Sequence, residues 1–156
     1  MWNDIAQTLL SEFSDLSQPT EIVRVTLRLM VAAVLGGVLG FEREHHGKSA
    51  GMRTHMLVAM GAALFVWIPQ QRGLSEGELG RVLQGLIAGV GFLGAGTIVK
   101  NTSEEHVHGL TTAAGIWMTA AIGVAAGLGR ESTAILSTIL ALIVLSTIPK
   151  ISKSST

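Results

Sequence analysis

The sequence predicts an all-α polytopic membrane protein, a helical bundle of about five transmembrane helices packed through small residues. Apolar residues make up 48% of the 156 residues, whereas charged residues make up only 14%. Five apolar segments are marked off by charges, and the last four, each of about 18 residues or more, contain no Asp, Glu, Lys or Arg. The 19 glycines also fit membrane helices, because glycine weakens a helix in water but lets membrane helices approach closely. A soluble bundle of unusually apolar helices is the disfavoured alternative.

The composition also excludes several functional classes. Lys and Arg number 11, as do Asp and Glu, so the net charge is zero, which argues against binding to nucleic acid. The absence of cysteine excludes a disulfide framework, a thiolate nucleophile and a zinc–thiolate site. Because no Ser-His-Asp arrangement or pair of catalytic carboxylates is evident, we expect no enzyme, no catalytic residue and no cofactor.

The chain divides into an N-terminal segment at residues 1–20, a membrane domain at 21–149 and a short cytoplasmic tail at 150–156. Apolar residues of the first segment at a spacing of three and four predict an amphipathic helix in the membrane interface, ended by Pro19; a frayed polar terminus is the alternative. The apolar residues at this spacing are Trp2, Ile5, Leu9, Phe13 and Leu16. The expected membrane segments are 29–41, 54–71, 82–99, 109–129 and 132–149.

Basic residues in the loops predict the orientation of the chain. One side, formed by the first loop, the third loop and the C-terminus, holds Arg43, Lys48, Arg53, Lys100, Lys150 and Lys153. The other side holds Arg72, Arg81 and Arg130, with Arg24 and Arg28 at the head of the first helix. This modest bias, with an odd number of spans, places the N-terminus outside and the C-terminus in the cytoplasm.

Glycine pairs at a spacing of four predict helix packing, because close backbone contact drives helix association in lipid. They are Gly36 and Gly40, Gly85 and Gly89, and Gly123 and Gly127. We therefore expect the first, third and fourth helices to form the centre and the glycine-poor fifth helix to lie outside. Residues 89–96 either pack against a neighbour or break their helix. The G-x-G-x-x-G pattern within them lacks the strand and the acidic residue of a dinucleotide site.

The carboxylate of Glu42 follows the first apolar segment directly. Only about 20 Å of helix separates it from Arg28, which is shorter than the hydrocarbon core. Arg28 is long enough to snorkel outward, whereas Glu42 has less reach. We expect Glu42 at or just inside the cytoplasmic face, paired with Arg43, Arg53 or a group on a partner. An ordinary interfacial salt bridge that sets helix register is the alternative.

All five histidines fall on the predicted cytoplasmic side, beside Glu44, Glu104 and Glu105. Imidazole near carboxylate suits zinc, nickel or copper better than magnesium. No defined metal spacing is present, so solvated loop polarity is favoured over a metal or proton-sensing role. The weak metal candidates are Glu42, His45, His46, His106 and His108, and His55 is the remaining histidine.

Several ordered motifs resemble a known family. The runs FERE, KSAGMRTHMLVAMGAAL, QGLIAGVGFLGAGTI and HGLTTAAGIWMTAAIGVAAGLG resemble the N-terminal membrane domain of the MgtC/SapB family across residues 28–129. The resemblance implies a bacterial inner-membrane protein linked to growth at low magnesium and, in pathogens, to virulence. The motif positions that it marks as functional are Arg28, Glu42, Arg43, Arg53, Thr54, His55, Gly91, Gly94, Gly96, Thr97, Gly109, Thr111 and Thr112.

The resemblance also bears on partners. Some members of the family are associated with inhibition of the F-type ATP synthase, and members named for virulence carry a soluble C-terminal domain. Because this sequence stops at Thr156, we expect a short form without that domain. Two functional classes stay open: a non-enzymatic regulator that docks onto a larger membrane complex, and a small oligomeric ion transporter or channel that uses the third helix and the Glu42 region. Membrane lipid, a complex such as the ATP synthase and a second copy of the chain are the expected partners.

Overall fold

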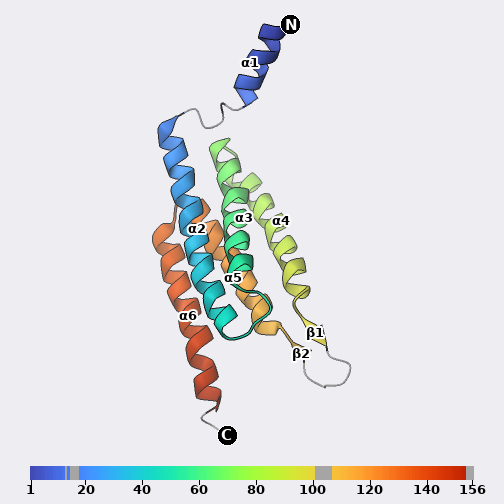
Figure 1. Cartoon of the computed structure of the whole chain (residues 1–156), viewed down its shortest axis with the longest axis vertical. Helices are drawn as coiled ribbons and strands as arrows, with labels where there is room; N and C mark the ends of the chain where they lie inside the picture. Colours follow the sequence, from blue (N-terminus) through green and yellow to red (C-terminus); the bar gives the residue numbers. More distant parts are fainter. Residues whose placement is uncertain (13, 15–17, 101–106, 154–156) are drawn as a thin grey trace.

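The computed structural model describes residues 1–12, 14, 18–100 and 107–153, and in them the chain is almost entirely helical (Figure 1). The all-helical class is therefore confirmed. A two-residue antiparallel ladder, β1 with β2, was not expected; it pairs Val99 with His108 and Lys100 with Val107. In chain order the elements are α1 Trp2–Glu12, α2 Pro19–His45, α3 Met52–Gln71, α4 Glu76–Ala95, β1 Val99–Lys100, β2 Val107–His108, α5 Leu110–Gly127 and α6 Glu131–Lys153.

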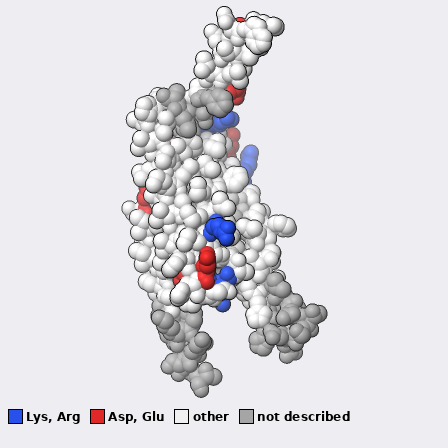
Figure 2. All heavy atoms as spheres, viewed as in Figure 1, with Lys and Arg blue, Asp and Glu red and all other residues white. Residues whose placement is uncertain are grey.

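Helices α2 to α6 correspond to the five predicted membrane segments. By length and composition, α2, α3 and α5 can cross a membrane among the residues described. Helix α4 falls short because Glu76, Glu78 and Arg81 lie in its first two turns, and a shorter apolar helix covers Glu131–Ser146 of α6. Figure 2 shows few charged side chains on one broad face of the bundle. Among the residues described, three of the five expected membrane helices thus have the length and composition of a full span.

Helix α1 stands apart from the bundle, and none of its residues is buried (Figure 1). It ends at Glu12 and not at Pro19, while Phe13 and Leu16 lie outside the described residues. Pro19 instead begins α2, because the first helical position needs no backbone N–H and suits the fixed backbone angle of proline. Helix α2 is 27 residues long, about 40 Å. It is continuous from the charged residues near its start, such as Glu21, to those near its end, such as Arg43.

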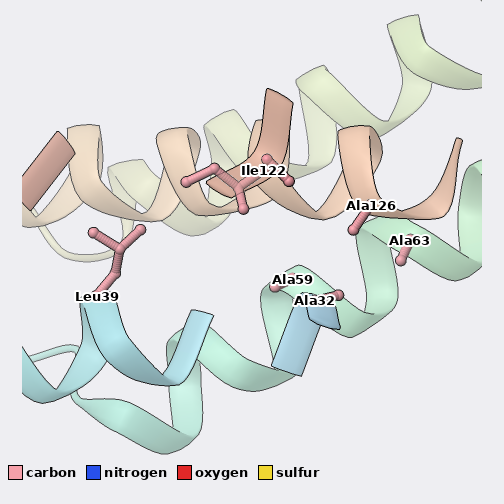
Figure 3. Close-up of a cluster of buried hydrophobic side chains, with 7 residues drawn as sticks. Ala32, Leu39, Ala59, Ala63, Ile122 and Ala126 are labelled. Carbon is pink, nitrogen blue, oxygen red and sulfur yellow. The ribbon is translucent and has the colours of Figure 1, made fainter. Parts of the chain in front are cut away.

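The centre of the bundle is formed by α2, α3 and α5, which corrects the expected centre of first, third and fourth helices. Small side chains make this close packing possible. In Figure 3 the side chains of α2, α3 and α5 converge on a shared core, with alanine at most of its positions. The cluster comprises Ala32, Leu39, Ala59, Ala63, Ile122, Ala126 and Ala134.

The glycine pairs behave differently from one another. A Cβ atom at Gly36 would lie 2.9 Å from the Cβ of Ala59, and one at Gly127 would lie 2.7 Å from the Cα of Ala63. A Cβ atom at Gly40 would likewise clash with Met52 of α3, and one at Gly123 would clash with the backbone of Ala59 of α3. At Gly85 and Gly89 nothing lies within 4 Å of such an atom. The expected packing role of that last pair is therefore wrong within the chain, because this part of α4 lies at the side of the bundle; nearer its end, Gly94 does pack against Ala113 of α5.

Helix α4 is continuous to Ala95, so residues 89–95 do not break it. Ser75 begins the helix in a capping box: its hydroxyl accepts from the Glu78 N–H, and the Glu78 carboxylate accepts from the Ser75 N–H. Helix α6 packs on α5 and α2, where Ala134 and Thr138 are buried, while Leu136 and Leu140 are exposed. Its position on the outside agrees with its lack of glycine.

Candidate functional site

A group of polar side chains lies inside the bundle at the end that holds loop 46–51. Its first members are Glu42 and Arg43 in the last turns of α2. The Arg43 side chain is 4% exposed, the Glu42 side chain is 11% exposed, and Arg43 Nη1 lies 3.4 Å from Glu42 Oε2. Arg43 continues the α2 face of Gly36 and Gly40, because steps of four and three return to one side of a helix. Burial weakens screening by water, so this attraction is stronger than that of a surface pair.

The residues after this pair join α2 to α3. The Glu44 carboxylate accepts a hydrogen bond of 2.9 Å from the N–H of Met52, the first residue of α3. A carboxylate at a helix N-terminus satisfies an otherwise unpaired donor and the positive end of the helix dipole. His46 Nδ1 lies 3.1 Å from Glu42 Oε1 and 2.8 Å from the Glu42 carbonyl oxygen. Loop 46–51 is thus held at both ends.

His55 contributes an imidazole from the first turn of α3 and is only 1% exposed. Its Nδ1 lies 2.7 Å from the Thr119 hydroxyl of α5, and that hydroxyl donates to the Gly115 carbonyl at 2.9 Å. A hydroxyl has one hydrogen, so His55 Nδ1 carries the hydrogen in this contact and donates it to Thr119. In the neutral ring the lone pair is then on Nε2. The interpretation of His55 as solvated loop polarity is wrong, because α3 begins before it and turns the ring into the bundle.

Four buried polar atoms of this group have no hydrogen-bond partner among the described residues. They are Glu42 Oε1, Arg43 Nε, Arg43 Nη2 and His55 Nε2. Of these, Glu42 Oε1 has the His46 ring as an ion-pair neighbour at 3.1 Å. The charges of both Arg43 and Glu42 act on the His55 ring, so these groups are electrostatic neighbours. Nε and Nη2 form the edge with which a guanidinium binds two acceptor atoms at once. The unpartnered donors and acceptors of the site can therefore bind small hydrogen-bonding species.

The weak metal candidates are only partly brought together. Glu42 and His46 are in contact, and the His45 ring meets the His46 ring edge to face at 5.7 Å. His108 belongs to β2, and His106 lies outside the described residues. Within the part of the chain that the structure describes, no three His, Cys, Asp or Glu side chains are grouped to hold a metal ion.

The other motif residues lie on several elements. Gly94, Thr97 and Gly109 meet where α4 ends and α5 begins: Thr97 Oγ1 donates to the Gly94 carbonyl at 2.7 Å. Gly109 has φ +95°, and a Cβ there would overlap the Thr97 carbonyl, so both the space and the backbone require glycine. Thr112 is buried, Thr54 is half-buried, and Arg53, Gly91, Gly96 and Thr111 are exposed.

Arg28 lies at the opposite end of the bundle, near loops 72–75 and 128–130. Its Nη1 donates to the Gly127 carbonyl at 2.8 Å and to Gln70 Oε1 at 3.0 Å. The guanidinium therefore turns inward onto the C-terminus of α5 instead of snorkelling outward. A cation at this position satisfies a free carbonyl and the negative end of the helix dipole.

Sequence reasoning missed Thr119, Gln70 and the capping role of Glu44. For Thr119 a signal was present, because Gly115, Thr119 and Gly123 follow one another at steps of four and must share a helix face. No comparable signal links Gln70 to Arg28, since 42 residues separate them.

Comparison with known proteins gives consistent matches. The model of the MgtC family matches residues 29–154. Protein SrpB of Synechococcus elongatus is 44% identical over 136 residues, which cover 78% of this chain and 73% of SrpB. The putative magnesium transporter YhiD of Escherichia coli is 41% identical over 76% of this chain and 58% of its own length. Protein MgtC of Salmonella typhimurium is 41% identical over 74% of this chain and 48% of its own. No solved structure matches.

Proposed function

The chain belongs to the MgtC family, and we propose that it is a non-enzymatic regulator in the bacterial inner membrane that supports adaptation to low magnesium. It acts by docking onto a helix of a larger membrane complex, with its N-terminus outside and its C-terminus in the cytoplasm. The F-type ATP synthase is the first complex to test, because the family resemblance suggests it.

The observation that carries this proposal is an open apolar groove between α3 and α4. Its volume is about 590 Å³, and its walls are mostly aliphatic. The three glycines in its lining are Gly61, Gly85 and Gly89, and a Cβ at any of them would meet nothing within 4 Å. Small residues drive helix pairing in lipid only when another backbone approaches them. This unpartnered glycine face therefore suits a transmembrane helix from outside the chain.

The test fills the groove without disturbing the bundle. Gly85→Leu and Gly89→Leu each place a bulky side chain in open space, so the protein should insert normally but lose its partner. Gly80→Leu is the matched control, because Gly80 is also in α4 and unpartnered but does not line the groove. Copurification with the ATP synthase, membrane abundance and growth at low magnesium are measured on the same cells. Equal copurification and growth for all three variants would contradict docking through this groove.

Ion transport is the second candidate, and the buried group of Glu42, Arg43 and His55 favours it. Its unpartnered polar atoms are unusual in the interior of a membrane bundle, where such groups mark ion or proton pathways. The relative YhiD is also named a putative magnesium transporter. Magnesium flux into liposomes that contain only the purified chain separates the two functions. A regulator should give no magnesium flux. If the wild type gives flux and the Glu42→Gln variant does not, ion transport replaces docking as the proposed function.

A further inference from the structure

A second cavity, of about 370 Å³, lies between the first turns of α2 and the last turns of α3. It differs from the groove beside α4 because its walls are polar: two guanidinium groups, one carboxylate, two amides and an indole. They belong to Glu21, Arg24, Arg28, Trp67, Gln70 and Gln71. With one carboxylate against two guanidinium groups, the lining has a net charge of +1.

Arg28 forms a fixed wall of this cavity. Its Nη1 already donates to the Gly127 carbonyl and to Gln70 Oε1, and these two hydrogen bonds hold the guanidinium at the cavity wall. The same contact orients Gln70, because an amide whose oxygen accepts from Arg28 keeps its NH₂ group available as a donor. Arg28 thus supplies a positioned charge and holds a donor in place.

Arg24 is one turn before Arg28 on the same face of α2, and the structure gives it no hydrogen bond or ion pair among the described residues. It is exposed, and its charge acts on Arg28. Two like charges one helical turn apart repel each other. The opposite charge of Glu131 acts on Arg28 more strongly than the charge of Arg24 does, and Glu21 is the only carboxylate in the lining, so Arg24 is the less compensated of the two. An anion between the guanidinium groups would relieve this repulsion.

We propose that this cavity binds a phosphate-type oxyanion, with Arg24 as its direct ligand and Gln70 and Gln71 as further donors. Guanidinium groups pair with phosphate oxygens through two parallel hydrogen bonds, and amide N–H groups complete such sites. The cavity lies where α2 changes from charged to apolar sequence, the depth at which lipid headgroups meet helix ends. The phosphate therefore belongs either to a phospholipid headgroup or to free inorganic phosphate.

The experiment uses the purified full chain and two probes: binding of inorganic phosphate by titration calorimetry, and retention of phosphatidylglycerol through detergent washing by native mass spectrometry. Arg24→Gln removes the direct ligand and leaves a surface position without contacts, so folding should be unaffected. Arg72→Gln is the matched control, because Arg72 is exposed at the same end but does not line the cavity. We expect Arg24→Gln to weaken binding of at least one probe by about tenfold and Arg72→Gln to change it little.

The two probes identify the source. Loss of phosphate affinity alone assigns free phosphate, loss of lipid retention alone assigns a headgroup, and loss of both assigns a site open to either. If the wild type binds neither probe, or if Arg24→Gln and Arg72→Gln change both probes equally, the proposal is overturned. Neither result bears on docking through the α3–α4 groove, which these variants do not touch.

Discussion

Gly123→Ala is the sharpest test of the packing between α3 and α5. A methyl group at this position would overlap the Ala59 carbonyl oxygen and lie 2.8 Å from the Ala59 Cα. Both atoms are backbone, so no side chain can move aside. The two helices would have to separate, and the shared core with Ile122 and Ala63 would open with them.

The magnitude follows from two opposing effects. Overpacking of a close interior typically costs about 1–3 kcal/mol, and contact with backbone places this case near about 3 kcal/mol. Alanine is better than glycine in a helix by about 1 kcal/mol, so a net loss of about 2 kcal/mol is expected. Gly85→Ala makes the same change where nothing lies within 4 Å, so it should gain up to about 1 kcal/mol.

The measurement is the free energy of unfolding of both variants and the wild type, from denaturation by sodium dodecyl sulfate in mixed micelles. Because the two substitutions are chemically identical, helix propensity cancels in their difference, and only packing is left. We expect Gly123→Ala to be less stable than Gly85→Ala by about 3 kcal/mol. Equal stability of the two would refute the assignment of α3 and α5 to the centre.

Three more predictions follow from the site and the orientation. Thr119→Val should cost about 1–3 kcal/mol because it leaves His55 Nδ1 buried and unpaired, whereas Thr119→Ser should be close to wild type in the same unfolding assay. Glu42→Gln should abolish growth at low magnesium while the protein still accumulates in the membrane; growth that falls only as far as abundance falls would mean a purely structural ion pair. Since the chain has no cysteine, Ser49→Cys should react with an impermeant thiol reagent only in opened cells and Leu74→Cys in intact cells; the reverse would invert the topology.

The positions of the helices could be predicted from the sequence because charges and apolar runs report directly on burial in lipid. The start of α2 could not, since Pro19 was expected to end the preceding helix and the first apolar segment begins only at residue 29. A helix needs only its own backbone hydrogen bonds, so it continues through the charges of Glu21, Arg24 and Arg28 to Pro19. The ladder between β1 and β2 was missed because two-residue strands have no periodicity to detect.

Glycine spacing alone could not identify the helix partners. Gly85 and Gly89 have the same spacing as Gly123 and Gly127, yet only the latter pair is packed. The difference lies in the opposing surface, because α3 presents Ala59 and Ala63 at the same step of four to α5. Against α4, the same helix presents larger side chains such as Leu57 and Phe65 at the groove walls. Packing in lipid needs small residues on both helices, and a pattern on one helix shows only half of the contact.

The candidate site was predicted in its charged part and missed in its neutral part. The cost of burying a charge alone predicted a partner for Glu42 but left open Arg43, Arg53 or a group outside the chain, and the structure pairs it with Arg43. His55 was grouped with the loop histidines, although Ala59 and Ala63 continue its helix face at steps of four and mark that face as buried. Periodicity of α3, applied to the histidine itself, would have placed it against α5.

Arg28 and Arg43, near the two ends of α2, differ in how they are used: Arg28 is half-buried and Arg43 is buried. Arg28 is satisfied by a carbonyl and an amide, so its burial is compensated within the fold, and its role is to close the C-terminus of α5. Arg43 has Glu42 as its partner through Nη1, and its Nε and Nη2 atoms have none among the described residues. An apolar pair of similar size would fill the same space without this desolvation cost. Stability alone therefore accounts for Arg28 but not for Arg43, and the unpartnered edge of Arg43 is where function should be sought first.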